Sequence, residues 1–402
     1  MQARTGLVLL TLLLCGWTWA IANATMPDAD TTAPPGPLRV ATFNSSLNDN
    51  QGRLIDRLLA GDAAARRIAA TIQRLRPDVI LLNEFDFDPE QRAAELFQRR
   101  YLEVGQFGEQ PITYAYRFSA AVNTGLPSGL DINGDGKSEG PGDAYGFGRH
   151  PGQFGMLVLS RYPLQTEQWR SFQTFLWHQM PNAHRPMRPD SDPPQPFHAD
   201  AIWKKLRLSS KSHWDLPVAT PLGTIHLLLS HPTPPVFDGR EDFNGLRNRD
   251  EILFWVEYLR SDQPQSWLTD DQGRSGPLDR HAQFVILGDL NNDPEDGAGH
   301  GSAMRALLQH PRIARFSAPQ SAGAVESAQR RRQAEGRTPL STHTAEFEAS
   351  VGSLRVDYVI PSAGLTVEDA GVFWPTSQQP ESDWLKATDH RLVWMDLRLA
   401  PP

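Results

Sequence analysis

Short apolar runs recur along the chain from residue 38 onward, and each has the length of a β-strand. Most of them lack polar residues at alternate positions, which a strand with one face in water would carry. We therefore expect strands that are covered on both faces. The runs span residues 38–43, 79–82, 156–159, 225–229, 284–287, 356–360 and 392–397.

Helical signals separate some of these strands. Residues 62–75 carry apolar side chains at helical spacing behind Asp62, which is suited to cap the first turn. A second helix is expected over residues 88–100, with Asp88 as its N-cap, and a third over residues 246–259. Strands that alternate with helices predict an α/β protein, but the connections do not decide between parallel and antiparallel pairing.

The first 24 residues have the pattern of a secretory signal peptide. Arg4 precedes an apolar stretch over residues 7–22, and Ala22-Asn23-Ala24 supplies the small residues of a cleavage site. A signal anchor is the alternative, although this stretch is shorter than the roughly 20 residues that span a bilayer. We expect cleavage after Ala24 and a secreted or periplasmic protein. No later stretch is long and apolar enough to span a membrane.

Composition indicates a globular protein. Of the 402 residues, 39% are hydrophobic and 21% are charged, which excludes a disordered or fibrous chain. Residues 25–37 are interpreted as a flexible lead-in because they end in a proline-rich stretch. Residues 38–400 then form a single folded domain, which we expect to be monomeric.

Charge and cysteine content narrow the picture further. The formal net charge is −8, and removal of the signal peptide with its single Arg4 gives −9 (−8 minus 1). Such acidity provides no overall attraction to nucleic acid, although a local basic surface stays open. Cys15, the only cysteine, lies inside the predicted signal, so the mature chain would have no disulfide. Lipid modification of Cys15 is the alternative, and the bulky Leu14 before it disfavours this.

Polar residues stand at the C-terminal ends of four apolar runs. If these strand ends converge, they gather acids, amides and imidazoles of the kind that hold a hard divalent cation and a phosphoryl group. Two further acids belong to the pattern, since Asp357 lies inside an apolar run and Asp389-His390 precedes the last one. The four strand-end groups are Asn44, Asn83-Glu84, Ser230-His231 and Asp289-Leu290-Asn291.

Six motifs in this order resemble the endonuclease/exonuclease/phosphatase superfamily, which has the DNase I-like fold. The resemblance implies an α/β protein built as a four-layered α/β/β/α sandwich of two packed mixed sheets, with the site at one edge of the sheets. It makes residues 38–400 the catalytic domain. The motifs are Thr42-Phe43-Asn44, Asn83-Glu84, Ser230-His231, Gly288-Asp289-Leu290-Asn291, Arg355-Val356-Asp357 and Thr388-Asp389-His390.

The resemblance implies a metal-dependent site. Glu84 would hold a catalytic Mg²⁺ or Mn²⁺, with Asn44 and Asp389 nearby. Asp289 would orient or deprotonate the attacking water, or assist the leaving oxygen. Many relatives have Gln where this chain has Asn83 before the metal-binding acid, so the amide group is kept.

The remaining implied roles concern phosphate. Asn291 and His231 would hold phosphate oxygens. His390 and Asp357 would form an imidazole–carboxylate pair in which the acid fixes the tautomer and favours the protonated ring. The sequence leaves open whether His390 acts as a base or as an electrostatic clamp.

A separate segment resembles the first half of a calcium-binding loop. Asp131, Asn133, Asp135 and Glu139 place oxygen ligands at alternate positions. Gly142 occupies the place of the closing acid, so an exposed turn is the alternative to a structural Ca²⁺.

Basic residues provide further candidates for phosphate binding. Arg149 precedes the strand at residues 156–159 and is suited to clamp a phosphate, with a solvent-facing loop as the alternative. Residues 204–207, together with Lys211 and His213, suggest a basic strand beside the site.

These observations predict an exported, divalent-metal-dependent phosphoesterase that cleaves phosphodiester bonds, as a nuclease does, by attack of water. A phosphomonoesterase and a sphingomyelinase-type phospholipase are the alternatives on the same core, because fold does not select the substrate. The expected partner is therefore a phosphoester in nucleic acid, phospholipid or a small molecule. A non-catalytic secreted calcium-binding module is the alternative from another class.

Overall fold

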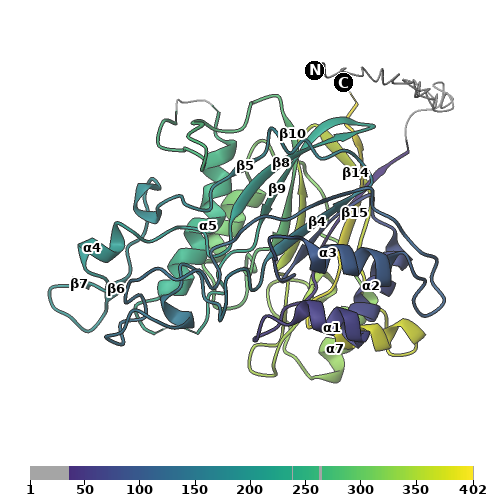
Figure 1. The fold of residues 1–402 in the computed structure, drawn as a ribbon, viewed down its shortest axis with the longest axis horizontal. Coiled ribbons are helices and arrows are strands. Elements are labelled where there is room, and N and C mark those ends of the chain that lie inside the picture. The colour runs from purple at the N-terminus through teal and green to yellow at the C-terminus, as the bar shows by residue number, and fades with distance from the viewer. Residues whose placement is uncertain (1–35, 238, 262–264, 402) are drawn as a thin grey trace, which may run out of the picture. The chain divides into compact units, whose positions relative to one another are not determined.

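The computed structural model describes residues 36–237, 239–261 and 265–401, and residues from 36 onward form one compact unit (Figure 1). The predicted signal peptide, residues 1–24, and most of the predicted lead-in lie outside the described residues. None of the helices in the described part of the chain has the length and hydropathy needed to cross a bilayer.

The first β-sheet has six strands in the order β14-β15-β1-β2-β4-β3. Only β1 and β2 run parallel, and every other neighbouring pair is antiparallel, so the sheet is mixed. Its strands are β1 (Leu38–Asn44), β2 (Val79–Asn83), β3 (Tyr116–Phe118), β4 (Met156–Ser160), β14 (Leu365–Val372) and β15 (Val393–Leu399).

The second sheet has five strands in the order β13-β10-β9-β8-β5. It repeats the same plan, with β9 and β10 parallel at its centre and antiparallel strands around them. Its strands are β5 (Arg170–Ser171), β8 (His213–Thr220), β9 (Gly223–Ser230), β10 (Gln283–Asp289) and β13 (Asp357–Pro361).

The two sheets pack face to face and helices cover their outer faces. Val40 and Leu81 of the first sheet share one buried cluster with Leu227 and Leu287 of the second. Helices α1 (Leu54–Ala60), α2 (Ala63–Leu75) and α3 (Arg92–Phe97) cover the other face of the first sheet, and α5 (Phe243–Leu259) and α6 (Gly301–Leu308) cover that of the second (Figure 1). This is the four-layered α/β/β/α sandwich predicted from the sequence.

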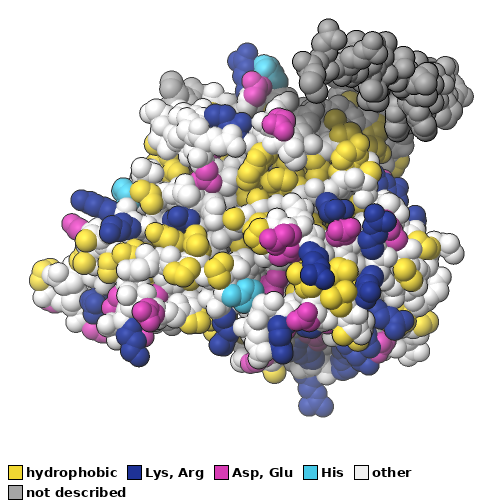
Figure 2. All heavy atoms as spheres, viewed as in Figure 1, with side chains coloured by type: hydrophobic (Ala, Val, Ile, Leu, Met, Phe, Trp, Pro, Cys, Tyr) yellow, Lys and Arg dark blue, Asp and Glu magenta, His cyan; other side chains and the backbone are white. Residues whose placement is uncertain are grey.

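Shorter elements lie in the connections between these layers. They are α4 (Asp200–Trp203), α7 (Ala322–Arg330), β6 (Met187–Arg188), β7 (Gln195–Pro196), β11 (Ala345–Glu346), β12 (Ser353–Leu354), and the 3₁₀ or π turns at Gln98–Leu102, Pro141–Asp143, Trp177–Gln179, Leu340–Thr342 and Pro380–Ala387. On the face shown in Figure 2, Lys and Arg side chains lie among Asp and Glu side chains instead of forming a separate basic surface.

All seven apolar runs form strands, which confirms the prediction from hydrophobicity. Two long strands, β8 and β14, were not predicted. Polar residues interrupt both of them, and β8 also contains Pro217, so neither has the continuous apolar run that identified the others.

The helix predictions are confirmed in part. Asp62 caps α2, because its carboxylate accepts a hydrogen bond from the amide of Ala65 at 2.8 Å. The predicted start at Asp88 is wrong: α3 begins at Arg92, because Gln91 has a left-handed backbone with φ of 53°. The carboxylate of Asp88 still accepts the amide of Arg92 at 2.8 Å, so it stabilises the later start.

Helix α5 begins three residues before its predicted start and buries more polar side chains than expected. The predicted inward residues Trp255 and Tyr258 are fully buried. The helix also buries Asn248, Asp250 and Glu251, each at most 1% exposed. Hydrogen bonds to neighbouring loops satisfy these groups, and such partners are not visible in a hydrophobic pattern.

Candidate active site

The central strands of both sheets end at the same place and bring the predicted residues together. In the first sheet, Asn44 and Asn83 are register partners at the C-terminal ends of parallel strands β1 and β2. In the second sheet, Asp289 at the end of β10 pairs with Asp357 at the start of β13. A hydrogen bond from Asn44 Nδ2 to Asp289 Oδ2, 3.0 Å long, joins the two sheets at this edge.

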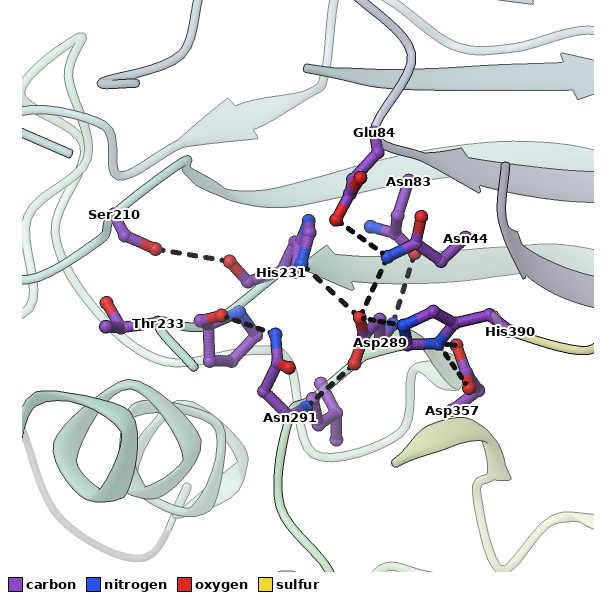
Figure 3. Close-up of polar contacts among 12 residues, drawn as sticks. Asn44, Asn83, Glu84, Ser210, His231, Thr233, Asp289, Asn291, Asp357 and His390 are labelled. Carbon is purple, nitrogen blue, oxygen red and sulfur yellow. Dashed lines mark hydrogen bonds and ion pairs between the residues drawn. The ribbon is translucent and has the colours of Figure 1, made fainter. Parts of the chain in front are cut away.

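Asn44 also connects Asp289 to the predicted metal ligand (Figure 3). Its Nδ2 donates to Glu84 Oε1 at 3.0 Å as well as to Asp289, so the two carboxylates share one amide donor. The second oxygen of Glu84 accepts from Asn48 Nδ2 at 2.9 Å. Glu84 is half-buried and has a left-handed backbone with φ of 56°, which turns its side chain out of the line of strand β2.

Two imidazoles approach the same oxygen of Asp289. Nε2 of His231 lies 3.4 Å from Asp289 Oδ2, and Nε2 of His390 lies 3.6 Å from it. On the other side of the ring, Nδ1 of His390 lies 2.9 Å from Asp357 Oδ2. Thr344 donates its hydroxyl to this same carboxylate at 2.8 Å. The predicted pair of His390 and Asp357 is therefore formed.

These contacts set the charges of the site. Burial alone would lower the pKa of His390, but the charges of Asp357 and Asp289 outweigh it and raise this pKa to about 10. Burial likewise opposes ionisation of Asp289, yet His390 and His231 lower its pKa well below the usual range. At neutral pH the centre of the site is therefore an imidazolium next to an ionised carboxylate.

The pKa of His231 is shifted in the opposite direction to that of His390. Burial lowers its pKa, and the positive charge of nearby Lys211 lowers it further. Its Nδ1 is buried without a hydrogen-bond partner among the described residues. Lys211 is itself 5% exposed, and its pKa is lowered by burial against the charges of Glu251, Glu84 and Asp289.

Asn291 and Asp389 complete the predicted set. The backbone amide of Asn291 donates to Asp289 Oδ1 at 2.9 Å, and its Nδ2 donates to the carbonyl of Pro232 at 3.1 Å. Asp389 is 52% exposed, and its Oδ1 lies 3.9 Å from Nε2 of His390. Thr388 ties this segment to strand β1, because its hydroxyl donates to the carbonyl of Asn44 at 3.1 Å.

The donor set suits a hard divalent cation on the Glu84 side of the site. No ion pair to Glu84 is formed by a basic residue of the described chain, and both its oxygens are held by amide donors that a cation can replace. Asp289, Asp357 and His390 also offer ligand atoms within 4.8 Å of one another. The last two already hold each other through Nδ1, and all three are buried.

Several residues of the site were not in the predicted set. Asn83 accepts the backbone amide of Asp289 at 3.1 Å, Asn48 holds Glu84, and Thr344 holds Asp357. Asn83 was identifiable from its place before Glu84. The sequence indicates Lys211 only as part of a basic strand, and its burial at the site depends on contacts that a sequence does not show.

Two predicted features lie apart from this centre. Arg149 is exposed and lines a pocket of 220 Å³ together with Glu139 and Asp143. Its role as a phosphate clamp stays a prediction. In the predicted calcium loop, Asp131 accepts the amides of Gly134 and Gly136, while Glu139 is exposed.

Comparisons with known proteins agree with the fold. A model of the endonuclease/exonuclease/phosphatase family matches residues 41–390. The endonuclease/exonuclease/phosphatase structure from Beutenbergia cavernae is 18% identical, with a TM-score of 0.51 over 91% of this chain and 72% of that chain. A family protein from Bacteroides thetaiotaomicron is 12% identical, with a TM-score of 0.46 over 91% of this chain and 99% of that chain. The human nocturnin catalytic domain is 14% identical, with a TM-score of 0.44 over 92% of this chain and 100% of that chain. No curated protein matches the chain.

Proposed function

The chain belongs to the endonuclease/exonuclease/phosphatase family, and we propose that it hydrolyses phosphodiester bonds with the aid of Mg²⁺ or Mn²⁺. One observation carries the proposal. Asn44, His231 and His390 keep Asp289 ionised. Asn44 also donates to Glu84, so one amide connects the two carboxylates. A carboxylate fixed between two imidazoles and a metal-type acid suits the attack of water on a phosphorus atom.

Glu84 would hold the cation, with Asn44 and Asp389 close to it. When bound, a divalent cation polarises the P–O bonds and neutralises charge that develops on the phosphoryl oxygens. The chain's own residues supply the rest of the chemistry.

Asp289 orients the attacking water by accepting its hydrogen bond. The low pKa of this carboxylate keeps it an acceptor at neutral pH. Asn291 fixes the carboxylate through its backbone amide, since this amide donates to the oxygen that faces away from the imidazoles. The side chain of Asn291 and the ring of His231 would hold phosphate oxygens.

His390 acts as an electrostatic clamp in this proposal. A ring with a pKa of about 10 is protonated at neutral pH and is therefore a donor, not a base. Because Asp357 holds Nδ1, the proton on Nε2 is available to a phosphoryl oxygen. Lys211 adds a second buried positive charge near Glu84 and Asp289.

The test is hydrolysis by the purified protein of bis(4-nitrophenyl) phosphate, 4-nitrophenyl phosphate, plasmid DNA, RNA, sphingomyelin and inositol phosphates. Each reaction is run with EDTA and after addition of Mg²⁺, Mn²⁺ or Ca²⁺. We expect diester cleavage that EDTA abolishes and Mg²⁺ or Mn²⁺ restores. Activity unchanged by EDTA would refute the metal requirement, and cleavage of the monoester alone would make the protein a phosphomonoesterase.

Variants at the metal site sharpen this test. Glu84→Gln keeps the shape of the side chain but removes its charge, so it should need far more Mg²⁺ for the same rate. Asp56→Asn on the exposed face of α1 is the matched control and should behave as the wild type. Equal Mg²⁺ dependence in all three proteins would contradict the assignment of Glu84.

We also propose that residues 1–24 direct export and are removed after Ala24. The composition of this segment supports the proposal. Sequencing the N-terminus of protein recovered from the periplasm or the medium tests it. A mature chain that still begins at Met1 would contradict it.

A further inference from the structure

We propose that Glu251, a buried acid of helix α5, is a positioning residue that holds Lys211 and His231 in place at the active site. The inference rests on the proposed function, since it takes these two side chains to bind the phosphoryl group of the substrate. Glu251 is 1% exposed, so it acts on the substrate only through the residues that it holds.

The two oxygens of the Glu251 carboxylate bind the segments that carry Lys211 and His231. Oε1 accepts the backbone amide of Ser210, the residue before Lys211, at 2.6 Å. Oε2 accepts the backbone amide of Thr233, two residues after His231, at 2.6 Å. Both bonds are buried, where a charged acceptor binds amide donors more strongly than it does in water. One side chain therefore fixes both segments against α5.

The two segments also contact each other beside the catalytic carboxylate (Figure 3). The hydroxyl of Ser210 donates to the carbonyl of His231 at 3.3 Å. Nε2 of this histidine lies 3.4 Å from Oδ2 of Asp289. A shift of Ser210 away from Glu251 would therefore displace the imidazole that contacts Asp289.

Two neighbours on α5 bind the same part of the chain. Arg247, one turn before the acid, donates to the carbonyls of residues 207–209 at distances of 2.8 to 3.1 Å. Asn248 donates its Nδ2 to the carbonyls of Thr233 at 2.8 Å and Leu290 at 3.0 Å. The helix therefore binds the backbone of three segments that lead to the site, and the acid supplies the acceptors for two of their amides.

The charge of Glu251 has a second effect on the site. Lys211 is 5% exposed, and burial lowers its pKa. The negative charge of Glu251 is the largest of the charges that oppose this, ahead of Glu84 and Asp289. Removal of one partner of a buried pair of charges leaves the other uncompensated, which is strongly unfavourable. Glu251 therefore fixes the backbone before Lys211 and balances the charge of its side chain.

Asp250 provides a matched control on the same helix. It is 0% exposed, and its carboxylate accepts Nε1 of Trp177 at 2.7 Å and the amide of His184 at 2.9 Å. These partners belong to residues 177–184, which include none of the proposed site residues. Loss of either buried charge should lower stability, but only the loss at Glu251 should affect the site.

The experiment measures the dissociation constant of inorganic phosphate by calorimetry, with saturating Mg²⁺, for the purified full-length protein and its variants. Glu251→Gln keeps the size of the side chain but turns one acceptor oxygen into a donor that meets a backbone N–H. We expect it to weaken phosphate binding at least about tenfold, because small displacements of positioned groups are costly. Glu251→Asp keeps the charge and should recover part of the affinity. Asp250→Asn should bind phosphate as the wild type does.

A second comparison tests whether Glu251 acts through Lys211. In a Lys211→Met background, Glu251→Gln should weaken phosphate binding less than it does in the wild type, because one of the residues that it positions is already changed. Circular dichroism checks that each variant is folded. If Glu251→Gln does not fold, Glu251→Asp takes its place in both comparisons.

Four results would each overturn the inference: wild-type affinity in Glu251→Gln, an equal loss in Asp250→Asn, full additivity with Lys211→Met, or no binding of phosphate by the wild type. The expected pattern of phosphate binding in a protein that cleaves no phosphoester would instead refute the proposed function and support the positioning role of Glu251.

Discussion

Acid should destabilise this protein through His213, a histidine on β8 that lies away from the proposed metal ligands. The ring is 1% exposed and packs against Phe254 and Trp255, with ring centroids 4.7 Å and 4.9 Å away. Its Nε2 lies 2.8 Å from the carbonyl of Glu251, which can only accept, so Nε2 carries the proton of the neutral ring. Nδ1 then accepts from Ser209 Oγ at 2.6 Å.

The magnitude follows from the pKa. Burial lowers the pKa of His213 from 6.5 to about 4, because the opposing charge of Glu251 and the hydrogen bond to its carbonyl are weaker. A difference of about 2.5 between the two states is worth about 3 kcal/mol, at about 1.36 kcal/mol for each pKa unit. The folded state binds its proton only at lower pH. This contribution is therefore complete above pH 6.5 and is lost as pH falls from 6.5 to about 4.

The assay is urea unfolding from about pH 8 to about pH 4 for the wild type and His213→Gln. Gln keeps a donor near the carbonyl of Glu251 but has no group that titrates in this range. We expect His213→Gln to be less stable at the alkaline end, because the smaller side chain leaves a cavity. Its free energy of unfolding should then fall less steeply on acidification, by up to about 1.36 kcal/mol per pH unit.

The comparison between the two proteins removes contributions from other groups. Asp86, whose burial raises its pKa to about 6, acts with the opposite sign in both proteins. Parallel curves for the wild type and His213→Gln from pH 6.5 to about 4 would refute the reasoning. His213 would then bind its proton equally well in the folded and unfolded states.

Three other substitutions test the site. Asp357→Asn leaves Nδ1 of His390 without its carboxylate, and kcat should fall about 10²- to 10⁴-fold with little change in KM. Asn44→Ala removes the donor that Glu84 and Asp289 share. A Mg²⁺ titration of the initial rate should then show weaker apparent binding of Mg²⁺ and a lower maximum rate. Lys211→Met removes the buried charge, and kcat/KM for a diester should fall at least about tenfold, whereas an unchanged value would make Lys211 structural only.

Much of the fold was predictable because its central strands are continuous apolar runs. Covered strands such as β2 and β10 carry so few polar residues that hydrophobicity alone identifies them. Strand β8 escapes this test because His213 and Asp215 are buried inside it, each with a specific partner. Such a strand is recognised only by its pairing with neighbouring strands, which exists only after folding.

The candidate site was predictable for a different reason. Its residues end strands, and parallel central strands bring their ends to one edge, so Asn44, Glu84 and Asp289 meet. What the sequence could not provide is the charge of each group. The protonated state of His390 depends on two carboxylates from other elements, and the burial of Lys211 depends on the packing around it.

The oxygen-rich turn shows the same limit. The spacing of Asp131, Asn133 and Asp135 is visible in the sequence. In the structure Asp131 and Asp135 accept backbone amides of their own turn and Glu139 is exposed, so calcium binding there stays a prediction.

The most direct test of the central claim is the rate of phosphodiester hydrolysis by Asp289→Asn, His390→Ala and the double variant, measured with saturating Mg²⁺. Because the carboxylate and the imidazolium act on the same water and phosphoryl group, each single change should lower kcat at least about 10³-fold. The double variant should then be no slower than the slower single variant. A His390→Ala protein with full activity, or losses that multiply in the double variant, would contradict the account.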